Sequence, residues 1–303
     1  MLKALQVPSA IGAGADVMKI SAIVVFSTLG LVACATQPAP KPPAQAALAA
    51  GAHYVSMGSS FAAGPGISTV EPGTPPRCAR SLDNYAHQLA RRRGLALSDA
   101  SCSGAVTANL LAAWDGVPPQ LDALRADTRL VTVTVGGNDL GYMSGLMAAS
   151  CLGLATPGTA PSANCRPAAV PDEAAYASVA SRLQQVAAEV RRRSPQARLV
   201  FVDYATVLPA SGRCAAMPLS DADAAISRDI DNRLRKLTAA VALENGASLL
   251  RAGEVTRDHH VCAAEPWMHG YVSPDPTRRV AVYHPTQAGM TAVAEALDRL
   301  LGR

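Results

Sequence analysis

The chain has 303 residues, of which 49% are hydrophobic and 17% are charged, and its formal net charge is +4. This composition excludes a disordered polymer, and the length predicts one globular domain of ordinary α/β size. The arginines behind the small positive charge form no long tract, which argues against a nucleic-acid-binding protein.

The first residues have the pattern of an export signal. A short basic start at Met18 precedes the apolar run 20–33, which is brief for a membrane span, and Cys34 follows it. Residues 31–34, Leu-Val-Ala-Cys, are similar to a bacterial lipobox. We therefore expect a signal peptide over 1–33, with Met18 as an alternative start, and a lipid on Cys34. A secretory signal cleaved nearby, without a lipid, is the alternative.

Residues 34–51 are rich in alanine and proline. Such a composition cannot build a packed core, so we expect a semi-extended tether there. The lipid and the tether would hold the protein in a bacterial cell envelope, and a single folded domain would occupy 52–303. Without the lipid, the protein would be secreted.

Within that domain, short apolar runs alternate with helical patterns. The expected strands are 53–57, 96–100, 130–135, 198–202 and 248–251, and the expected helices are 84–93, 172–193, 221–245 and 286–301. This alternation predicts a three-layer α/β/α fold of flavodoxin-like type, with a mostly parallel five-stranded sheet. Segments 141–171 and 255–282 break the alternation, and we expect them to be irregular. Functional residues should directly follow the strands, at their carboxyl ends.

The first strand runs into two adjacent serines, Ser59 and Ser60, and then into a glycine at Gly64. A serine at a strand-to-helix turn exposes its hydroxyl, and the first N–H groups of the helix have no internal partner. This arrangement suits a nucleophile with an adjacent oxyanion donor. A simple helix cap is the structural alternative for either serine.

Three further residues stand at element boundaries. Gly104 follows the second expected strand, Asn138 follows the third, and His284 directly precedes the last helix. A glycine lets a backbone N–H approach a substrate, a carboxamide can donate to an oxyanion, and a neutral imidazole can act as a base. Each residue alone is equally typical of an ordinary turn, but together with a serine and in this order they favour a serine hydrolase.

With these residues the chain resembles the SGNH hydrolases, also called GDSL-type esterases and lipases, over 54–301. The matching blocks are Gly-Ser-Ser-Phe-Ala-Ala-Gly at 58–64, the glycine at 104, Gly-Asn-Asp at 137–139 and His-Pro at 284–285. The resemblance implies an ester hydrolase that needs no metal and no cofactor.

The same resemblance assigns roles. Ser60 would be the nucleophile and His284 its base. The N–H groups of Ser60 and Gly104 and the side chain of Asn138 would form the oxyanion hole. Protonation of His284 would give the activity an acidic limb at about pH 6 to 7.

Two positions depart from the family pattern. The aspartate that usually precedes the nucleophile is Ser59, and the acid that usually stands three residues before the histidine is Ala281. We expect the backbone carbonyl of Ala281 or a neighbour to accept the Nδ1–H of His284, as in a Ser-His dyad. Asp275 and Asp258 are the alternative acids.

Six cysteines remain besides Cys34, an even number typical of an exported protein with three disulfides. Six cysteines allow 15 pairings. We expect sequential pairs, and similarity to the secreted actinobacterial branch of the family, which extends to the Pro-Trp-Met-His-Gly run at 266–270, supports them. The expected pairs are Cys78–Cys102, Cys151–Cys165 and Cys214–Cys262.

A metal site is conceivable at His259, His260 and His269 with Asp258, but adjacent histidines rarely point to one metal, and no spaced ligand signature completes the set. We expect a monomer that uses an ester or lipid ester as substrate and binds no nucleic acid. The favoured function is an exported serine esterase. The alternatives are a lysophospholipase or acyltransferase, a carbohydrate deacetylase, and an inactive lipoprotein that binds lipid or glycan.

Overall fold

A five-stranded parallel sheet forms the centre of the protein. In the computed structural model, which describes residues 47–156, 158, 160–272 and 280–302, the strands follow the order β2-β1-β3-β4-β5 and all pairings are parallel. The strands are β1 (His53–Gly58), β2 (Ala96–Asp99), β3 (Thr128–Thr134), β4 (Arg198–Val202) and β5 (Ser248–Leu250). The expected signal peptide, Cys34 and nearly all of the tether lie outside the described residues.

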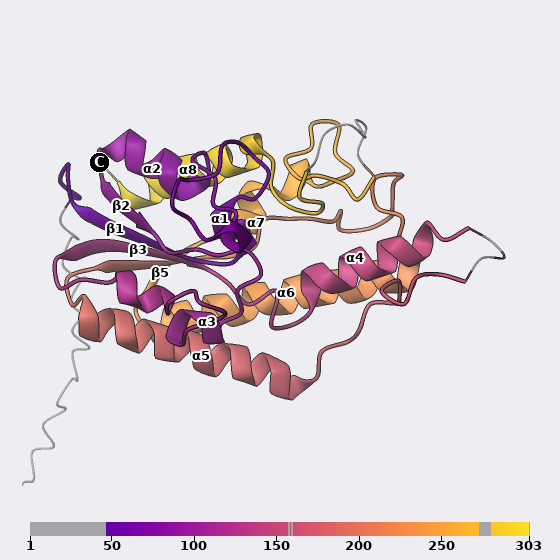
Figure 1. Cartoon of the computed structure of the whole chain (residues 1–303), viewed down its shortest axis with the longest axis horizontal. Coiled ribbons are helices and arrows are strands. Elements are labelled where there is room, and N and C mark those ends of the chain that lie inside the picture. The colour runs from indigo at the N-terminus through magenta and orange to yellow at the C-terminus, as the bar shows by residue number, and fades with distance from the viewer. Residues whose placement is uncertain (1–46, 157, 159, 273–279, 303) are drawn as a thin grey trace, which may run out of the picture. The chain divides into compact units, whose positions relative to one another are not determined.

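Helices cover both faces of the sheet (Figure 1). One face carries α2 (Tyr85–Arg93) and α8 (Gln287–Leu301), and the other carries α5 (Glu173–Arg193) and α6 (Asp221–Glu244). Shorter elements are α1 (Ser60–Ala63), η1 (Pro76–Cys78), α3 (Ala108–Leu111), η2 (Gln120–Ala123), α7 (Ala252–Val255) and η3 (Arg257–His259). The predicted three-layer α/β/α architecture is thus confirmed, and its strand order is the flavodoxin-like one.

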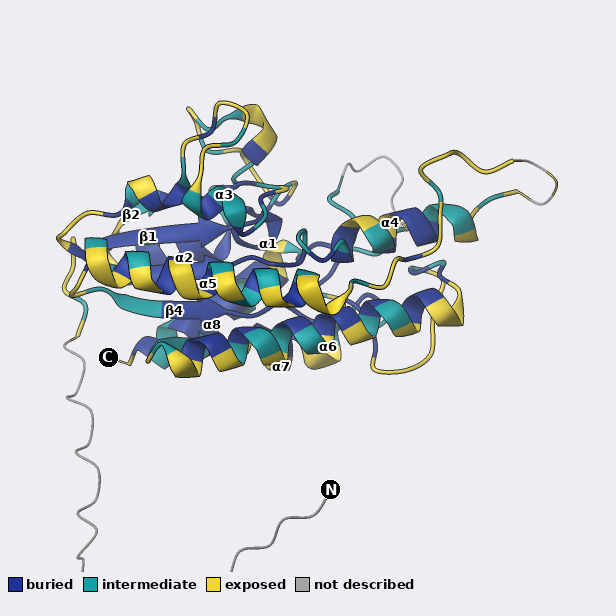
Figure 2. Ribbon diagram, turned by 90° about the horizontal axis from the view of Figure 1, so that it is seen from below, coloured by how far each residue is buried: buried dark blue, intermediate teal, exposed yellow. Residues whose placement is uncertain are grey.

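The strands alternate their side chains between the two helical layers. Tyr54 and Leu130 pack with the α2 and α8 side, whereas Val55 and Val131 belong to the larger cluster with α5 and α6. Because both faces are covered, apolar residues of the central strands β1, β3 and β4 point to both sides of the sheet. Strand β1 is buried throughout and β3 nearly so, while the outer faces of α5 and α6 are exposed (Figure 2).

Side-chain caps fix the starts of the long helices. The Asn84 side chain accepts the N–H of His87 at α2, and Thr286 accepts that of Gly289 at α8. Each capped start satisfies an N–H that the helix leaves open. Arginine triplets end α2 and α5, as their position before a glycine and a Ser-Pro pair predicts.

One long helix lies in a segment that the sequence predicts to be irregular. This helix, α4 (Tyr142–Gly153), packs against α6 (Figure 1). Its sequence is a weak helix signal, because Gly145 lies inside it, Gly153 ends it, and its N-cap, Gly141, has no capping side chain. Gly153 has a packing reason, since a Cβ there would lie 1.9 Å from the carbonyl oxygen of Pro218.

The structure contains the disulfides Cys78–Cys102, Cys151–Cys165 and Cys214–Cys262. These are the sequential pairs that the sequence suggests. Among the described helices, none combines the length and apolar character that crossing a membrane requires.

Candidate active site

Strands β1 and β3 end side by side, and this brings their following turns together. Gly58, the last residue of β1, pairs with Thr134, the last residue of β3. Gly58 has φ +141°, and a Cβ there would lie 2.2 Å from the carbonyl oxygen of Thr134. Only glycine fits this contact, so the first block of the family motif begins with a residue that the close approach of two strands requires.

Ser60 lies next to His284, 224 residues away in the chain. Its Oγ is 2.7 Å from Nε2 of the imidazole. Ser60 is the first residue of α1, and the N-cap is Ser59. Ser60 is 6% exposed and His284 is 9% exposed, so both residues are largely shielded from water. The hydrogen bond between a hydroxyl and an imidazole is the arrangement that activates a serine.

The other ring nitrogen of His284 bonds a backbone carbonyl, that of a neighbour of Ala281. Nδ1 donates to the carbonyl oxygen of Val282, at 2.7 Å, and not to that of Ala281. The Ala281 carbonyl instead accepts the backbone N–H of His284, which closes a tight turn. With its proton on Nδ1, the ring offers an unprotonated Nε2 to Ser60. Burial lowers the pKa of His284; the Val282 carbonyl raises it, and the nearby His269 lowers it further.

The two alternative acids fare differently. Asp275 lies outside the described residues. Asp258 belongs to η3 and lines a cavity of about 390 Å³ together with Asp231 and His260, a cavity whose lining includes neither Ser60 nor His284.

The 266–270 segment holds the histidine loop by backbone hydrogen bonds. Tyr283 donates to His269 at 2.9 Å, and His269 donates to His284 at 2.9 Å. Farther along, Thr286 donates to the carbonyl of Trp267 at 2.8 Å. The Pro-Trp-Met-His-Gly run therefore supports His284 as an adjoining backbone segment. The Trp267 ring itself stacks on His259, with centroids 3.5 Å apart.

Two of the expected oxyanion donors are backbone N–H groups. Among the described residues, the N–H groups of Ser60 and Gly104 donate no hydrogen bond. Gly104 has φ +84°, a conformation that favours glycine. Asn138 is tied to the same region, because its Nδ2 donates to the Ala105 carbonyl at 2.9 Å. The three expected oxyanion donors thus lie on neighbouring loops, and Asn138 keeps one N–H unused by this bond.

Asp139 connects the loop after β2 to the loop after β3. Its carboxylate accepts the backbone N–H of Thr107 at 2.9 Å and the Thr107 hydroxyl at 2.5 Å. It therefore acts as a buttress for the loop that carries Gly104.

Two buried residues that the sequence does not single out hold the nucleophile turn. The Gln120 side chain accepts the N–H of Gly58 at 2.6 Å and donates to its carbonyl at 2.9 Å. The Tyr204 hydroxyl lies 3.1 Å from Oγ of Ser59. Nothing in the sequence around Gln120 signals this role. Tyr204 stands two residues after β4, so its place at a strand's carboxyl end would have been a signal.

A comparison with family models now decides the family. The model of the GDSL-like Lipase/Acylhydrolase family matches residues 56–292. The chain belongs to this family. The resemblance to SGNH hydrolases is confirmed, and membership makes the chain an ester hydrolase. In the described part of the chain, no group of three His, Cys, Asp or Glu side chains could hold a metal ion.

Curated relatives are lipases of Streptomyces. Lipase 2 of Streptomyces coelicolor is 31% identical over 260 residues, which cover 82% of this chain and 85% of that protein. The lipase of Streptomyces rimosus is 27% identical over 241 residues, covering 78% of this chain and 82% of the relative.

Solved structures agree in fold. Phospholipase A1 from Streptomyces albidoflavus and the extracellular lipase from Streptomyces rimosus each superpose with a TM-score of 0.63 at 25% identity. Both alignments cover 82% of this chain, with 99% of the phospholipase and 98% of the lipase. The acetylxylan esterase Axe2 from Geobacillus stearothermophilus has the same fold, with a TM-score of 0.50 at 14% identity over 85% of this chain and 97% of that one.

Proposed function

We propose that the protein is an exported serine esterase that hydrolyses acyl esters with a Ser60–His284 dyad. One observation carries the proposal, the 2.7 Å contact between Oγ of Ser60 and Nε2 of His284. The Nδ1 hydrogen bond to Val282 supports it, because it leaves Nε2 free to accept the serine proton. A backbone carbonyl does for the ring orientation what a carboxylate does in a triad.

In the first half of the reaction, Oγ of Ser60 attacks the ester carbonyl carbon while Nε2 of His284 takes the hydroxyl proton. The carbonyl oxygen becomes an oxyanion, which the N–H groups of Ser60 and Gly104 and Nδ2 of Asn138 stabilise. When the bond to the alcohol breaks, the imidazolium returns the proton to the leaving oxygen. The product is an acyl ester on Ser60.

In the second half, water attacks that acyl ester, and His284 takes a proton from the water. A second oxyanion forms in the same hole. The bond between the acyl carbon and Oγ then breaks, the carboxylic acid leaves, and Ser60 recovers its proton from His284. No step needs a metal or a cofactor.

A phospholipid is the second candidate for the substrate. The phospholipase A1 of Streptomyces albidoflavus aligns with this chain over nearly all of its own length, at 25% identity. A protein held at a membrane by a lipid would meet phospholipid esters directly. A panel of p-nitrophenyl esters of graded chain length, phosphatidylcholine, lysophosphatidylcholine and acetylated xylan would rank these substrates.

Export is supported by the disulfides and by the extracellular relative. The anchor rests on the lipobox-like run before Cys34. Radioactive palmitate should label the wild-type protein in a bacterial host and should not label Cys34→Ser. Equal labelling of both proteins would refute the anchor while leaving the esterase proposal intact.

The nucleophile is tested with a fluorophosphonate probe. The probe should label the wild-type protein and Ser59→Ala but not Ser60→Ala. Ser59→Ala should keep most of the p-nitrophenyl ester hydrolysis, whereas Ser60→Ala should abolish it. Ser59→Ala is a matched control, since it removes the neighbouring hydroxyl from the same turn. A folded wild-type protein that resists the probe would instead indicate the inactive binding protein.

A further inference from the structure

The hydroxyl of Tyr204 joins the two turns that carry the proposed catalytic groups. Its oxygen accepts the backbone N–H of Gly137 at 3.0 Å and lies 3.1 Å from Oγ of Ser59. Because the phenol oxygen accepts from Gly137, its own hydrogen is available to the serine oxygen. Tyr204 is 2% exposed, so water does not compete for these bonds.

Both partners of Tyr204 directly precede proposed catalytic groups. Ser59 precedes the nucleophile Ser60, and Gly137 precedes the oxyanion donor Asn138. The two turns follow different strands, β1 and β3. A single hydroxyl from the end of β4 therefore helps to fix the distance between the nucleophile and one wall of the oxyanion hole.

We propose that Tyr204 is a positioning residue that holds Ser60 and Asn138 in register for attack. This inference rests on the proposed esterase function. Tyr204 touches no reacting atom, and it acts through the backbone of the two turns. Its bond to Ser59 occurs at the position where the family pattern has an aspartate.

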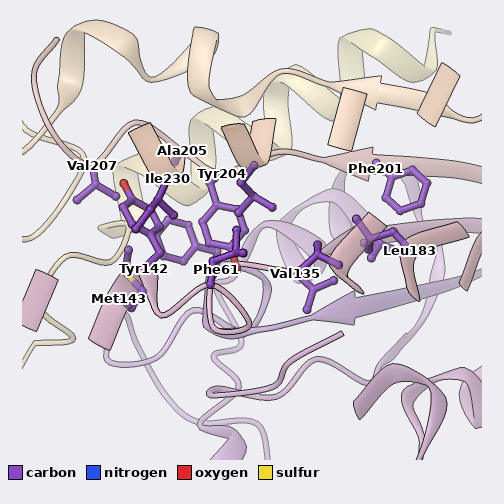
Figure 3. Close-up of a cluster of buried hydrophobic side chains, with 14 of the residues drawn as sticks. Phe61, Val135, Tyr142, Met143, Leu183, Phe201, Tyr204, Ala205, Val207 and Ile230 are labelled. Carbon is purple, nitrogen blue, oxygen red and sulfur yellow. The ribbon is translucent and has the colours of Figure 1, made fainter. Parts of the chain in front are cut away.

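The packing around the ring leaves the hydroxyl little freedom. The Phe61 ring lies 4.6 Å from the Tyr204 ring between centroids, and Tyr142 lies 6.3 Å away in an edge-on contact (Figure 3). A Cβ at Gly137 would lie 2.9 Å from the hydroxyl and the adjacent ring carbons. Glycine at 137 is thus required by the approach of the tyrosine, and the two groups are fitted to each other.

The phenol keeps its proton throughout the range of an esterase assay. Burial raises the pKa of Tyr204 to about 12, while its hydrogen bonds to Ser59 and Gly137 lower it. The bond to Ser59 therefore does not change between pH 5 and 9, and loss of the hydroxyl should not move the pH profile of the enzyme.

The test is Tyr204→Phe, which removes the hydroxyl and keeps the ring. We expect kcat on a p-nitrophenyl ester to fall roughly 10- to 100-fold, because small displacements of catalytic groups have effects of that order. KM and the acidic limb of the pH profile should stay unchanged. Affinity for a boronic acid, which forms a tetrahedral adduct on a serine, should fall by the same factor as kcat.

Tyr54→Phe is the matched control. Tyr54 is a fully buried tyrosine whose hydroxyl bonds Thr132 at 2.8 Å, near the middle of the sheet. Tyr54→Phe should lose about as much stability as Tyr204→Phe does, but it should keep the wild-type kcat. If both variants have the same kcat, Tyr204 has only a structural role and the proposal is wrong.

Ser59→Ala supplies an independent measurement if Tyr204→Phe does not fold. It removes one of the two bonds of Tyr204, so kcat should fall by about twofold at constant KM. In the double variant with Tyr204→Phe, kcat should be no lower than in Tyr204→Phe alone, since both changes break the same link. Additive losses, or an unchanged kcat in Ser59→Ala, would overturn the inference. A wild-type protein without esterase activity would refute the proposed function instead.

Discussion

The Nδ1–H of His284 donates to the carbonyl oxygen of Val282, two residues earlier in the same turn, at 2.7 Å. A carbonyl orients the imidazole as a carboxylate would, but it has no charge with which to stabilise an imidazolium. Burial therefore has the largest effect on the pKa of His284 and lowers it, and the adjacent His269 lowers it further.

The lowered pKa of His284 predicts that activity falls on the acidic side below pH 6.5, the usual pKa of histidine. His284 must be neutral to accept the serine proton, so activity is present above its pKa and disappears as the pH falls through it. The sequence predicts a limb at about pH 6 to 7, and burial of His284 moves the expected limb to lower pH. The measurement is kcat/KM against pH, with circular dichroism over the same range as a control for unfolding. A midpoint above 6.5 would contradict the dyad without a carboxylate.

Tyr283 links the histidine loop to α4. Its backbone is left-handed, with φ +59°, and its hydroxyl lies 2.5 Å from Oγ of Ser150, with both side chains fully buried. Ser150→Ala leaves a buried phenol without this partner, so we expect the free energy of unfolding to fall by about 1–3 kcal/mol. Urea denaturation measures the loss.

Ser144→Ala is the matched control on the same helix. Its hydroxyl bonds the Gly141 carbonyl at 3.2 Å but is exposed, so the change should stay within about 0.5 kcal/mol. Equal stability of Ser150→Ala and Ser144→Ala would show that the Tyr283 hydroxyl does not need Ser150.

The sheet was predictable because its strands are covered on both faces. Most of β3 is then a β-branched run, from Val131 to Thr134, and the turns after such strands can be identified by position. The helix α4 was not predictable, because it contains two glycines, and Gly153 is required by a close contact with Pro218, in another part of the chain. Such contacts have no local signature.

The same distinction applies to the site. Ser60, Gly104, Asn138 and His284 stand at element boundaries, where their residue types have few common uses. The carbonyl partner of His284 depends on the geometry of a tight turn, so sequence located it only to within one residue. Gln120 and Tyr204 support the site from segments distant in sequence. No local pattern identifies Gln120, whereas Tyr204 follows a strand and only its position gives a signal.

The Cys78–Cys102 disulfide fastens the loop that carries Gly104. Both sulfurs are fully buried, and the backbone N–H of Ser103 donates to the Cys78 carbonyl at 3.1 Å. Replacing both cysteines by alanine should lower the free energy of unfolding by about 2–4 kcal/mol. It should also lower kcat, because the Gly104 N–H loses its fixed place in the proposed oxyanion hole.

Replacing Cys151 and Cys165 by alanine is the control. That disulfide joins the end of α4 to the following loop and is partly exposed. Its removal should lower stability while kcat at a temperature well below unfolding stays unchanged. If both double variants lower kcat equally, the first disulfide has no special connection to the site. Thermal denaturation measures the loss of stability, and initial rates at about 20 °C measure the change in kcat.

Gln120 and Gly58 form the final link between the sheet and the nucleophile turn. The amide side chain satisfies both the N–H and the carbonyl of Gly58, and Gln120 is only 2% exposed. Gln120→Leu keeps the volume and leaves the Gly58 N–H buried without its partner, so unfolding should become easier by about 1–3 kcal/mol. Gln184→Leu, on the exposed side of α5, should change stability by about 0.5 kcal/mol or less.

Because Gly58 lies two residues before Ser60, we also expect kcat to fall in Gln120→Leu and not in Gln184→Leu. Unchanged stability in Gln120→Leu would mean that water replaces the amide, and the turn would then owe its shape to Gly58 and Thr134 alone.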